Sequence, residues 1–178
     1  MKLLLHICCA PCLIEPHQAL KDKFSLTGFF YNPNIHPEGE FNNRFMALRN
    51  YTKDIKLETI YPIFDTQEFF DNIENNLDKP KRCQLCWRMR LEKTAFYARV
   101  NNFEYFSTTL LVSRYQDHEL LREIAEEVSN KVNIKFYYQD FRPKFKEAYN
   151  KAKIKGLYLQ KYCGCIYSNE EKNQKKCN

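Results

Sequence analysis

Short apolar runs alternate along the chain with longer stretches of helical spacing. Strands are predicted for the apolar runs at residues 2–7, 24–32, 57–64, 104–113 and 133–141. Helices are predicted where apolar positions recur every three or four residues, at 10–23, 38–55, 66–76, the second half of 77–102, 117–132 and 143–155. Because strands separated by helices build βαβ units, we expect an α/β fold, a doubly wound and mostly parallel sheet with helices on both faces. Pro62 lacks a backbone donor, which weakens the third run as a strand or places it at a sheet edge.

Length and composition are those of one globular unit. The chain has 178 residues, of which 44% are hydrophobic and 28% charged, so we expect a single domain over 1–178 that ends in a cysteine-containing segment at about 157–178. No apolar stretch approaches the roughly 20 residues that a membrane helix needs. The apolar start "MKLLLHICC" is too short for a secretory signal. We therefore expect a cytoplasmic protein without a membrane partner.

Seven of the eight cysteines fall into three tight clusters, at 8–12, 83–86 and 163–165. The cytoplasm keeps thiols reduced, so a framework of structural disulfides is not expected. Inert core cysteines would be scattered along the chain, and these are not. The clustering indicates a metal site or redox chemistry, with unreactive core thiols as the alternative.

The first cluster, "CCAPC", follows the first predicted strand and begins the first predicted helix. In parallel sheets, ligands bind outside the carboxyl ends of the strands. A helix N-terminus also lowers thiol pKa values. Cys8, Cys9 and Cys12 are therefore expected as thiolates that are ready to bind a metal or to attack a substrate.

The second cluster is a Cys-x-x-Cys motif formed by Cys83 and Cys86. Such a motif can be half of a zinc site, a thioredoxin-type pair or two ligands of an iron–sulfur cluster. Its position after three βα units disfavours thioredoxin. A four-ligand zinc site would leave three clustered cysteines unused, whereas adjacent cysteines can reach different corners of a [4Fe–4S] cluster.

In the third cluster, "YCGCIYS", Cys163 and Cys165 flank Gly164. A disulfide across one glycine is strained, and strain makes a disulfide easy to reduce. This spacing suits a redox-active pair that relays electrons. The alternative is a second pair of metal ligands.

The net charge of +6 makes a polyanionic partner such as nucleic acid plausible, with a solvated lysine-rich surface as the alternative. Phosphate contacts are predicted from the basic residues around the second cluster, Lys79, Lys81, Arg82, Arg88 and Arg90.

The stretch "TTLLVSRYQDHE" ends a predicted strand and begins a helix. Its polar side chains are candidates for substrate binding or, alternatively, for capping: Thr108, Thr109, Ser113, Tyr115 and Asp117.

Four motifs taken together, "HICCAPC", "RCQLCWRMR", "STTLLVSRYQDHE" and "KYCGCIYS", resemble epoxyqueuosine reductases of the QueH type in order and spacing. The resemblance implies a fold like that of the nucleotide α-hydrolase (HUP) group and a [4Fe–4S] cluster. It also implies a reaction, the reductive removal of the epoxide oxygen of epoxyqueuosine at the wobble position of tRNA, the last step of queuosine formation. The partners are then tRNA that carries epoxyqueuosine and an unidentified electron donor.

The same resemblance implies a role for each cysteine cluster. Cys8, Cys9, Cys83 and Cys86 match the ligands of the [4Fe–4S] cluster, and Cys163 and Cys165 match the redox-active pair. The family also suggests a mononuclear iron beside the cluster, for which Cys12 is the candidate ligand.

Two other functions fit parts of the sequence. An iron–sulfur-dependent tRNA thiolation enzyme of the same fold would use ATP, but "CCAPC" stands where a Gly-rich phosphate loop would be and contains no glycine. A non-catalytic, zinc-stabilised RNA-binding module would need neither iron nor a redox pair.

A reductase also needs a proton donor for the departing oxygen, and His6, Tyr115, Asp117 and His118 are the candidates.

Overall fold

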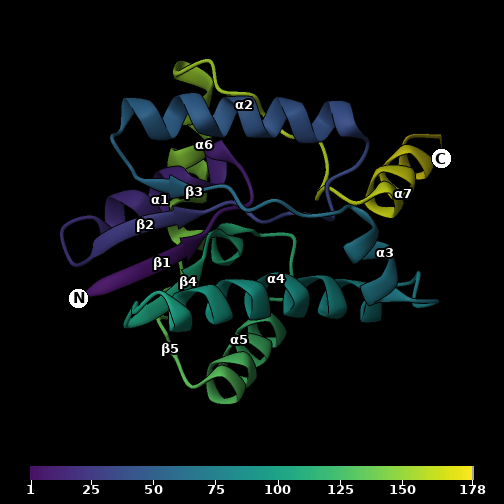
Figure 1. Cartoon of the computed structure of the whole chain (residues 1–178). Helices are drawn as coiled ribbons and strands as arrows, with labels where there is room; N and C mark the ends of the chain where they lie inside the picture. Colours follow the sequence, from purple (N-terminus) through teal and green to yellow (C-terminus); the bar gives the residue numbers. More distant parts are fainter. Residues whose placement is uncertain (178) are drawn as a thin grey trace.

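The computed structural model describes residues 1–177, with side chains through 174. Its centre is a five-stranded, all-parallel sheet in the order β3-β2-β1-β4-β5 (Figure 1). The strands are β1 (Lys2–His6), β2 (Ser25–Phe29), β3 (Thr59–Ile60), β4 (Tyr105–Thr108) and β5 (Lys135–Phe136). The helices are α1 (Ala10–Leu20), α2 (Glu38–Asp54), α3 (Gln67–Ile73), α4 (Lys81–Val100), α5 (His118–Val132), α6 (Phe145–Ile154) and α7 (Ile166–Cys177). Short 3₁₀ turns lie at Thr109–Val112 and Arg142–Lys144.

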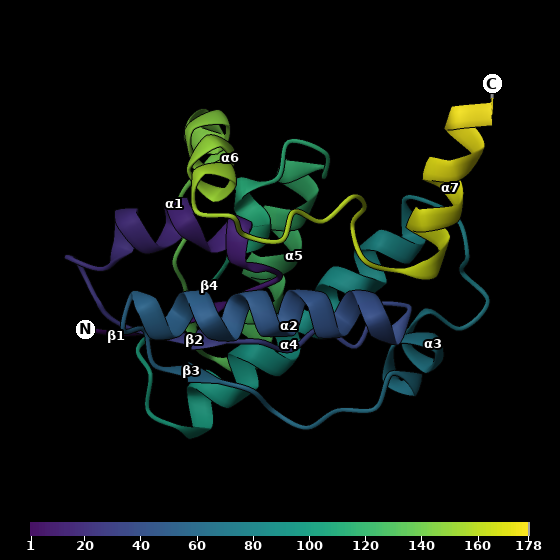
Figure 2. The ribbon, with the colours of Figure 1, turned by 90° about the horizontal axis from the view of Figure 1, so that it is seen from above.

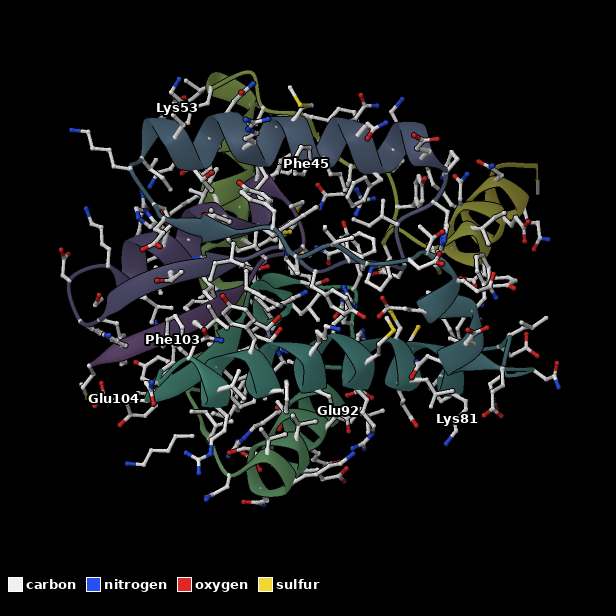
Figure 3. The ribbon with its side chains drawn as sticks, in the orientation of Figure 1. Phe45, Lys53, Lys81, Glu92, Phe103 and Glu104 are labelled. Atoms are coloured by element: carbon white, nitrogen blue, oxygen red, sulfur yellow. The ribbon has the colours of Figure 1, made fainter. Side chains whose placement is uncertain are left out.

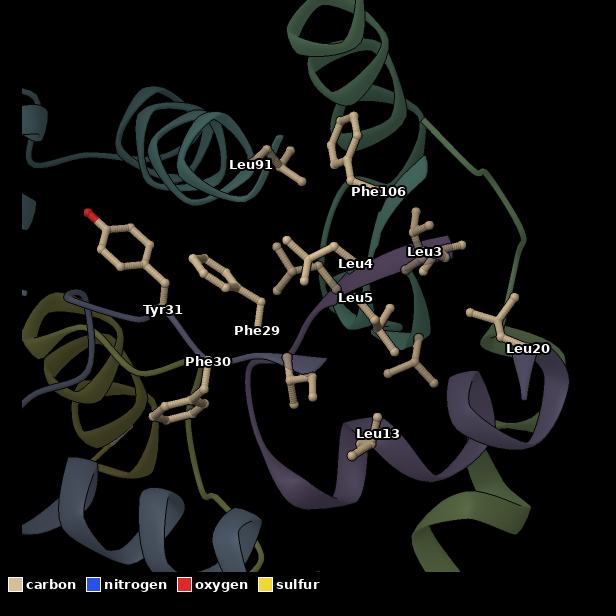
Figure 4. Close-up of a cluster of buried hydrophobic side chains, with 14 of the residues drawn as sticks. Leu3, Leu4, Leu5, Leu13, Leu20, Phe29, Phe30, Tyr31, Leu91 and Phe106 are labelled. Atoms are coloured by element: carbon tan, nitrogen blue, oxygen red, sulfur yellow. The ribbon is translucent and has the colours of Figure 1, made fainter. Parts of the chain in front are cut away.

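Helices cover both faces of the sheet, as predicted. Helices α4 and α5 pack together on one face, and α1, α2 and α6 lie on the other (Figures 1 and 2). The central strand β1 is apolar on both sides, because Leu3, Leu4 and Leu5 are fully buried between these layers (Figure 4). Phe45 lies between α2 and the sheet, whereas Lys53 and Lys81 extend from the outer surfaces of their helices (Figure 3). The α/β fold expected from the sequence is therefore confirmed.

Three elements differ from the prediction. The strand expected at 104–113 ends at Thr108, because the Thr108 hydroxyl accepts a hydrogen bond from the Leu110 backbone N–H at 3.1 Å and turns the chain into a 3₁₀ helix. The strand expected at 133–141 pairs only over two residues. Helix α7 was not predicted at all, since its sequence "IYSNEEKNQKKC" has almost no apolar stripe. The third strand is short and lies at the sheet edge, in agreement with Pro62.

The fold brings distant segments together beyond the carboxyl end of the sheet. Cys9 is the N-cap residue of α1, and Pro11 lies in the first turn of that helix. Helix α4 is 20 residues long and runs past the strands, so its first turn lies near α3 and α7 (Figure 1). Among residues 1–177, none of the helices combines the length and apolar character that a bilayer span requires.

Candidate metal and redox site

A cavity of about 720 Å³ opens beyond the carboxyl end of the sheet. Its walls come from the start of α1, the first turns of α4, the segment after β4 and the loop before α7. All three cysteine clusters contribute to it: Cys8, Cys12, Cys83, Cys86, Cys163 and Cys165. Segments that are 150 residues apart in sequence thus supply thiols to one space.

The first cluster forms a compact thiol group at the β1–α1 junction. The sulfurs of Cys8, Cys9 and Cys12 all lie within 4.8 Å of one another, close enough to share a metal ion. The Thr109 hydroxyl donates to Cys8 Sγ at 3.3 Å and accepts from the Cys8 N–H at 3.1 Å. Hydrogen bonds from the thiols of Cys12 and Cys9 hold the pKa of Cys8 well below its usual value, so Cys8 is the first of the three to become a thiolate.

The Cys83-x-x-Cys86 motif occupies the first turn and a half of α4, which turns both residues to the cavity. Cys86 is 7% exposed and lies in a small apolar cluster with Phe69 and Cys165. Burial raises the pKa of Cys86 to about 12 and also raises that of Cys83. In the absence of a bound cation these two residues are therefore neutral thiols.

Arg90 places a buried positive charge beside the thiols. Its side chain is 1% exposed, and its Nε donates to the Cys86 carbonyl at 3.1 Å. Its Nη2 has no hydrogen-bond partner, and within residues 1–174 no carboxylate pairs with it. Burial opposes the charge on Arg90, but the thiols of Cys86 and Cys163 and other nearby cysteines raise its pKa above the usual value. A buried guanidinium without a carboxylate partner suits a site whose cysteines are negatively charged thiolates when a metal is bound.

A second buried arginine fixes the loop that carries the third cluster. Arg44 on α2 is 1% exposed and pairs with Glu40 one turn away, at 2.7 Å. Its two terminal nitrogens donate to the carbonyls of Tyr162 and Cys163, each at 3.0 Å. Tyr162 also donates to the His36 carbonyl, and the Gly164 carbonyl accepts from the His36 N–H at 2.9 Å. The loop therefore has a defined position over the cavity.

Gly164 has the backbone conformation that the third cluster needs. Its φ angle is +145°, and a Cβ placed there would lie 3.0 Å from the Asn34 side-chain nitrogen. Cys163 is exposed at the cavity, with Gln116 Nε2 at 3.9 Å from its sulfur, whereas Cys165 is 7% exposed and its sulfur accepts from the Ser168 N–H at 3.4 Å. The loop presents one accessible and one buried thiol. Both are free cysteines here.

The structure separates the candidate proton donors. Tyr115 and Asp117 line the cavity. His6 is fully buried beneath it, bonded to the Thr108 hydroxyl at 2.9 Å, and burial lowers the pKa of His6 to about 4. His118 is buried against Tyr138 and does not line the cavity. Of the candidate substrate-binding residues, Thr109 and Ser113 also line the cavity, while Thr108 supports β4 and His6.

The prediction of phosphate contacts is wrong for two arginines. Arg90 is buried beside the thiols, and Arg82 is 2% exposed and pairs with Glu171 on α7. Because both side chains are buried, neither is available at the surface for a phosphate contact. Lys79 lines the cavity mouth, and Arg88 is half-exposed and pairs with Glu127.

Several residues of the site were not recognised in the sequence. They are Arg44, Gln116 and Gln160. The side-chain nitrogen of Gln160 lies 3.4 Å from Cys12 Sγ. Arg44 and Gln160 are isolated polar residues outside the motifs, and Gln116 lies within "STTLLVSRYQDHE" but was not singled out there. Arg90 does carry a sequence signal. It lies four residues after Cys86 and four before Thr94, which is the helical spacing of the buried face of α4.

The donor set fits a thiolate-bound metal centre. Soft thiolate ligands select zinc, copper(I) or iron–sulfur clusters, and Arg44 and Arg90 can offset the negative charge of several thiolates. Three clusters supply more thiols than the four that one zinc ion takes.

Comparisons with known proteins give one consistent family. A family model described as "Epoxyqueuosine reductase QueH" matches residues 3–171. The protein of that name from Dehalococcoides mccartyi is 37% identical over 173 residues, which cover 96% of this chain and 94% of the relative. The one from Thermotoga maritima is 33% identical over 180 residues, which cover 97% and 92%.

A solved structure shares the fold. It is described as the crystal structure of a predicted subunit of tRNA methyltransferase from Methanocaldococcus jannaschii. The TM-score is 0.61 with 11% identity, over 86% of this chain and 74% of that one. At this identity the similarity concerns the arrangement of the elements alone.

Proposed function

This chain belongs to the epoxyqueuosine reductase QueH family, and from that membership we propose that it reduces epoxyqueuosine in tRNA with a [4Fe–4S] cluster held by Cys8, Cys9, Cys83 and Cys86. The family acts in queuosine biosynthesis, and its members are oxidoreductases. The protein would work in the cytoplasm, where thiols stay reduced.

One observation carries this proposal. Six cysteines from three clusters line one cavity at the end of the sheet where parallel α/β folds bind their ligands. The compact group of Cys8, Cys9 and Cys12 supports metal binding at the start of α1. Cys83 and Cys86 supply further thiols from the first turns of α4.

The reaction consumes two electrons and two protons. The two carbon–oxygen bonds of the epoxide break, a carbon–carbon double bond forms, and the oxygen leaves as water. When bound, a [4Fe–4S] cluster supplies electrons one at a time.

The chain's own residues prepare the site for this chemistry. Arg90 holds positive charge beside the cluster ligands, and Arg44 fixes the loop of Cys163 above them. Cys163 is accessible and Cys165 lies two residues away, so the pair can alternate between dithiol and disulfide and pass two electrons on. Tyr115 and Asp117 are the candidate proton donors that reach the cavity.

Cys12 has a role distinct from the four cluster ligands. Its sulfur lies in the same compact group as Cys8 and Cys9 and receives the Gln160 amide at 3.4 Å. We propose it as a ligand of a mononuclear iron next to the cluster. When bound there, such an ion would supply Lewis-acid chemistry.

The test is an oxygen-free preparation assayed for metal and for turnover. We expect iron and acid-labile sulfide with broad absorbance in the blue region. With a chemical reductant, tRNA that carries epoxyqueuosine should lose one oxygen from the modified base, as measured by mass spectrometry after nuclease digestion. Zinc in place of iron, or an unchanged nucleoside, would overturn the proposal.

A further inference from the structure

Three aromatic rings form a continuous rim along one side of the cavity. Tyr115 follows the 3₁₀ turn after β4 and is 90% exposed, while Phe145 and Tyr149 come from the first turns of α6. The Tyr115 and Phe145 rings meet edge to face with centroids 6.3 Å apart, and Phe145 and Tyr149 lie nearly parallel at 6.2 Å and 17°. All three line the same cavity as the cysteines. We name them the aromatic rim.

Two cations lie against the aromatic rim. The Arg114 guanidinium lies 6.0 Å from the Phe145 ring centroid, and Lys153 Nζ lies 4.8 Å from that of Tyr149. Within residues 1–174 neither cation forms a salt bridge. Segment 142–155, which supplies Phe145 and Tyr149, carries one acidic residue, Glu147, and six basic ones, of which Arg142 pairs with Asp140: Arg142, Lys144, Lys146, Lys151, Lys153 and Lys155.

This combination favours unpaired nucleotides as the occupant. Single-stranded nucleic acids are bound by aromatic rings that stack on bases beside cations that hold phosphates. Surfaces that bind proteins are depleted in lysine, which is abundant here. An enzyme that modifies a nucleotide reaches it in a single strand or extrudes it from its stack, and in either case the bases beside it are free to stack on protein rings.

We propose that Tyr115, Phe145 and Tyr149 stack against unpaired bases next to the modified nucleotide, while Arg114 and Lys153 hold the adjoining phosphates. The proposal rests on the proposed function for the location of the reacting nucleotide in the cavity. It adds the surface that receives the rest of the RNA loop. Because stacking needs only a ring face, this surface would tolerate different bases at the flanking positions.

The experiment uses the metal-loaded protein and two synthetic RNAs, an anticodon stem-loop and a fully paired duplex of equal length. Affinity is measured by fluorescence anisotropy, with 2-aminopurine placed beside the wobble position to report stacking. We expect Tyr115→Ala and Tyr149→Ala to bind the stem-loop about 10-fold more weakly and to lose the quenching of 2-aminopurine. Tyr115→Phe should retain both, because it keeps the ring.

Controls separate stacking from charge and from folding. Phe96→Ala removes an exposed aromatic of α4, 61% exposed, that does not line the cavity, and should bind like the wild type. Arg114→Ala and Lys153→Ala should each lower the salt dependence of binding by about one unit of slope, whereas Tyr115→Ala should leave that slope unchanged. Circular dichroism and iron content verify that each variant is folded and loaded.

Distinct outcomes overturn the proposal. Unchanged stem-loop affinity and quenching in Tyr115→Ala and Tyr149→Ala would do so, as would equal losses for the duplex and the stem-loop. A change of oligomeric state in Tyr115→Ala would assign the rim to a second copy of the chain instead. If RNA binding follows the expected pattern but epoxyqueuosine is not reduced, the proposed function fails while the stacking surface stands.

Discussion

Arg90 lies one helical turn beyond Cys86, and its Nε donates to the Cys86 carbonyl where only 1% of the side chain is exposed. Within residues 1–174 this buried cation has no carboxylate partner, which is costly, so we expect the thiolates of a metal-loaded site to offset its charge. We expect Arg90→Met to bind metal about 10-fold to 100-fold more weakly, as is typical when a group behind a metal ligand is lost. The metal affinity of Arg90→Lys should lie between those of Arg90→Met and the wild type. Iron release to a chelator under exclusion of oxygen measures the effect.

Arg88→Met provides the matched control for this prediction. Arg88 lies two residues before Arg90 on the same helix, but it is half-exposed and pairs with Glu127 at the surface. Its substitution should leave iron release unchanged. Equal rates for Arg90→Met and the wild type would contradict a role of Arg90 toward the metal.

The Cys83-x-x-Cys86 motif gives a direct test of the ligand set. We expect Cys83→Ala and Cys86→Ala to lose iron, visible absorbance and turnover together, because each removes one proposed corner ligand. Cys177→Ser alters a cysteine outside the proposed set and should keep all three. Full iron content in both alanine variants would remove α4 from the metal site.

The Arg44–Glu40 pair predicts a stability effect that depends on burial. Both side chains are buried, so Arg44→Met leaves the Glu40 carboxylate without its charged partner and removes the two hydrogen bonds to the loop carbonyls. The substitution should cost about 3–5 kcal/mol of unfolding free energy. The Arg122–Glu126 pair on α5 has the same spacing of four residues but is exposed. Arg122→Met should cost only about 0.5 kcal/mol. Denaturant unfolding of the two variants under identical loading measures the difference, and similar costs would contradict the argument.

His118 predicts part of the pH dependence of stability. Burial lowers the pKa of His118, and the nearby Arg142 acts in the same direction, against the weaker opposing effects of Asp140 and Glu119. The unfolded chain therefore binds the proton more readily than the folded protein. Stability falls as the pH drops below the pKa of histidine in the unfolded chain, about 6.5. His118→Gln should reduce the loss of thermal stability between about pH 7 and pH 5. An identical pH profile for the variant and the wild type would show that this residue contributes nothing to it.

The sequence predicted the frame of the fold because short runs rich in apolar residues alternate with stretches of helical spacing, and the run of the central strand β1 is continuous. Leu3, Leu4 and Leu5 contact helices on both faces of the sheet, and such a pattern needs no tertiary information. Helix α7 could not be predicted in this way. Among its side chains up to residue 174, only Tyr167 packs against an apolar cluster, and the other contacts of α7 include the ion pairs of Glu171 with Lys79 and Arg82. Ion pairs between distant segments leave no periodic signal.

The cysteines of the site and four polar residues of the segment after β4 were visible in the sequence, but the buried arginines beside the thiols were not. Clustering alone singled out the thiols, because cysteine is rare and its spacing is meaningful. Arg82 and Arg90 stand in a basic stretch that looks like a solvated surface, yet both are buried. Only the packing of α4 against α3, α7 and the sheet shows that their charge faces inward. The number of basic residues in this stretch therefore overestimates the positively charged surface that is available to RNA.

Cys163 and Cys165 are predicted to cycle between dithiol and disulfide during turnover without holding the cluster. The loop is fixed by Arg44 independently of any metal, and Gly164 at φ +145° permits the bend between the two residues. A disulfide across one glycine is strained and easily reduced, which suits a pair that receives electrons and passes them on. Cys163→Ser should therefore keep its iron and its visible spectrum, complete at most one turnover and then stop. Thiol alkylation followed by mass spectrometry should find the wild-type pair oxidised after substrate is consumed without added reductant. Loss of iron in Cys163→Ser would instead assign the residue to the metal site, and normal multiple turnover would leave it with neither role.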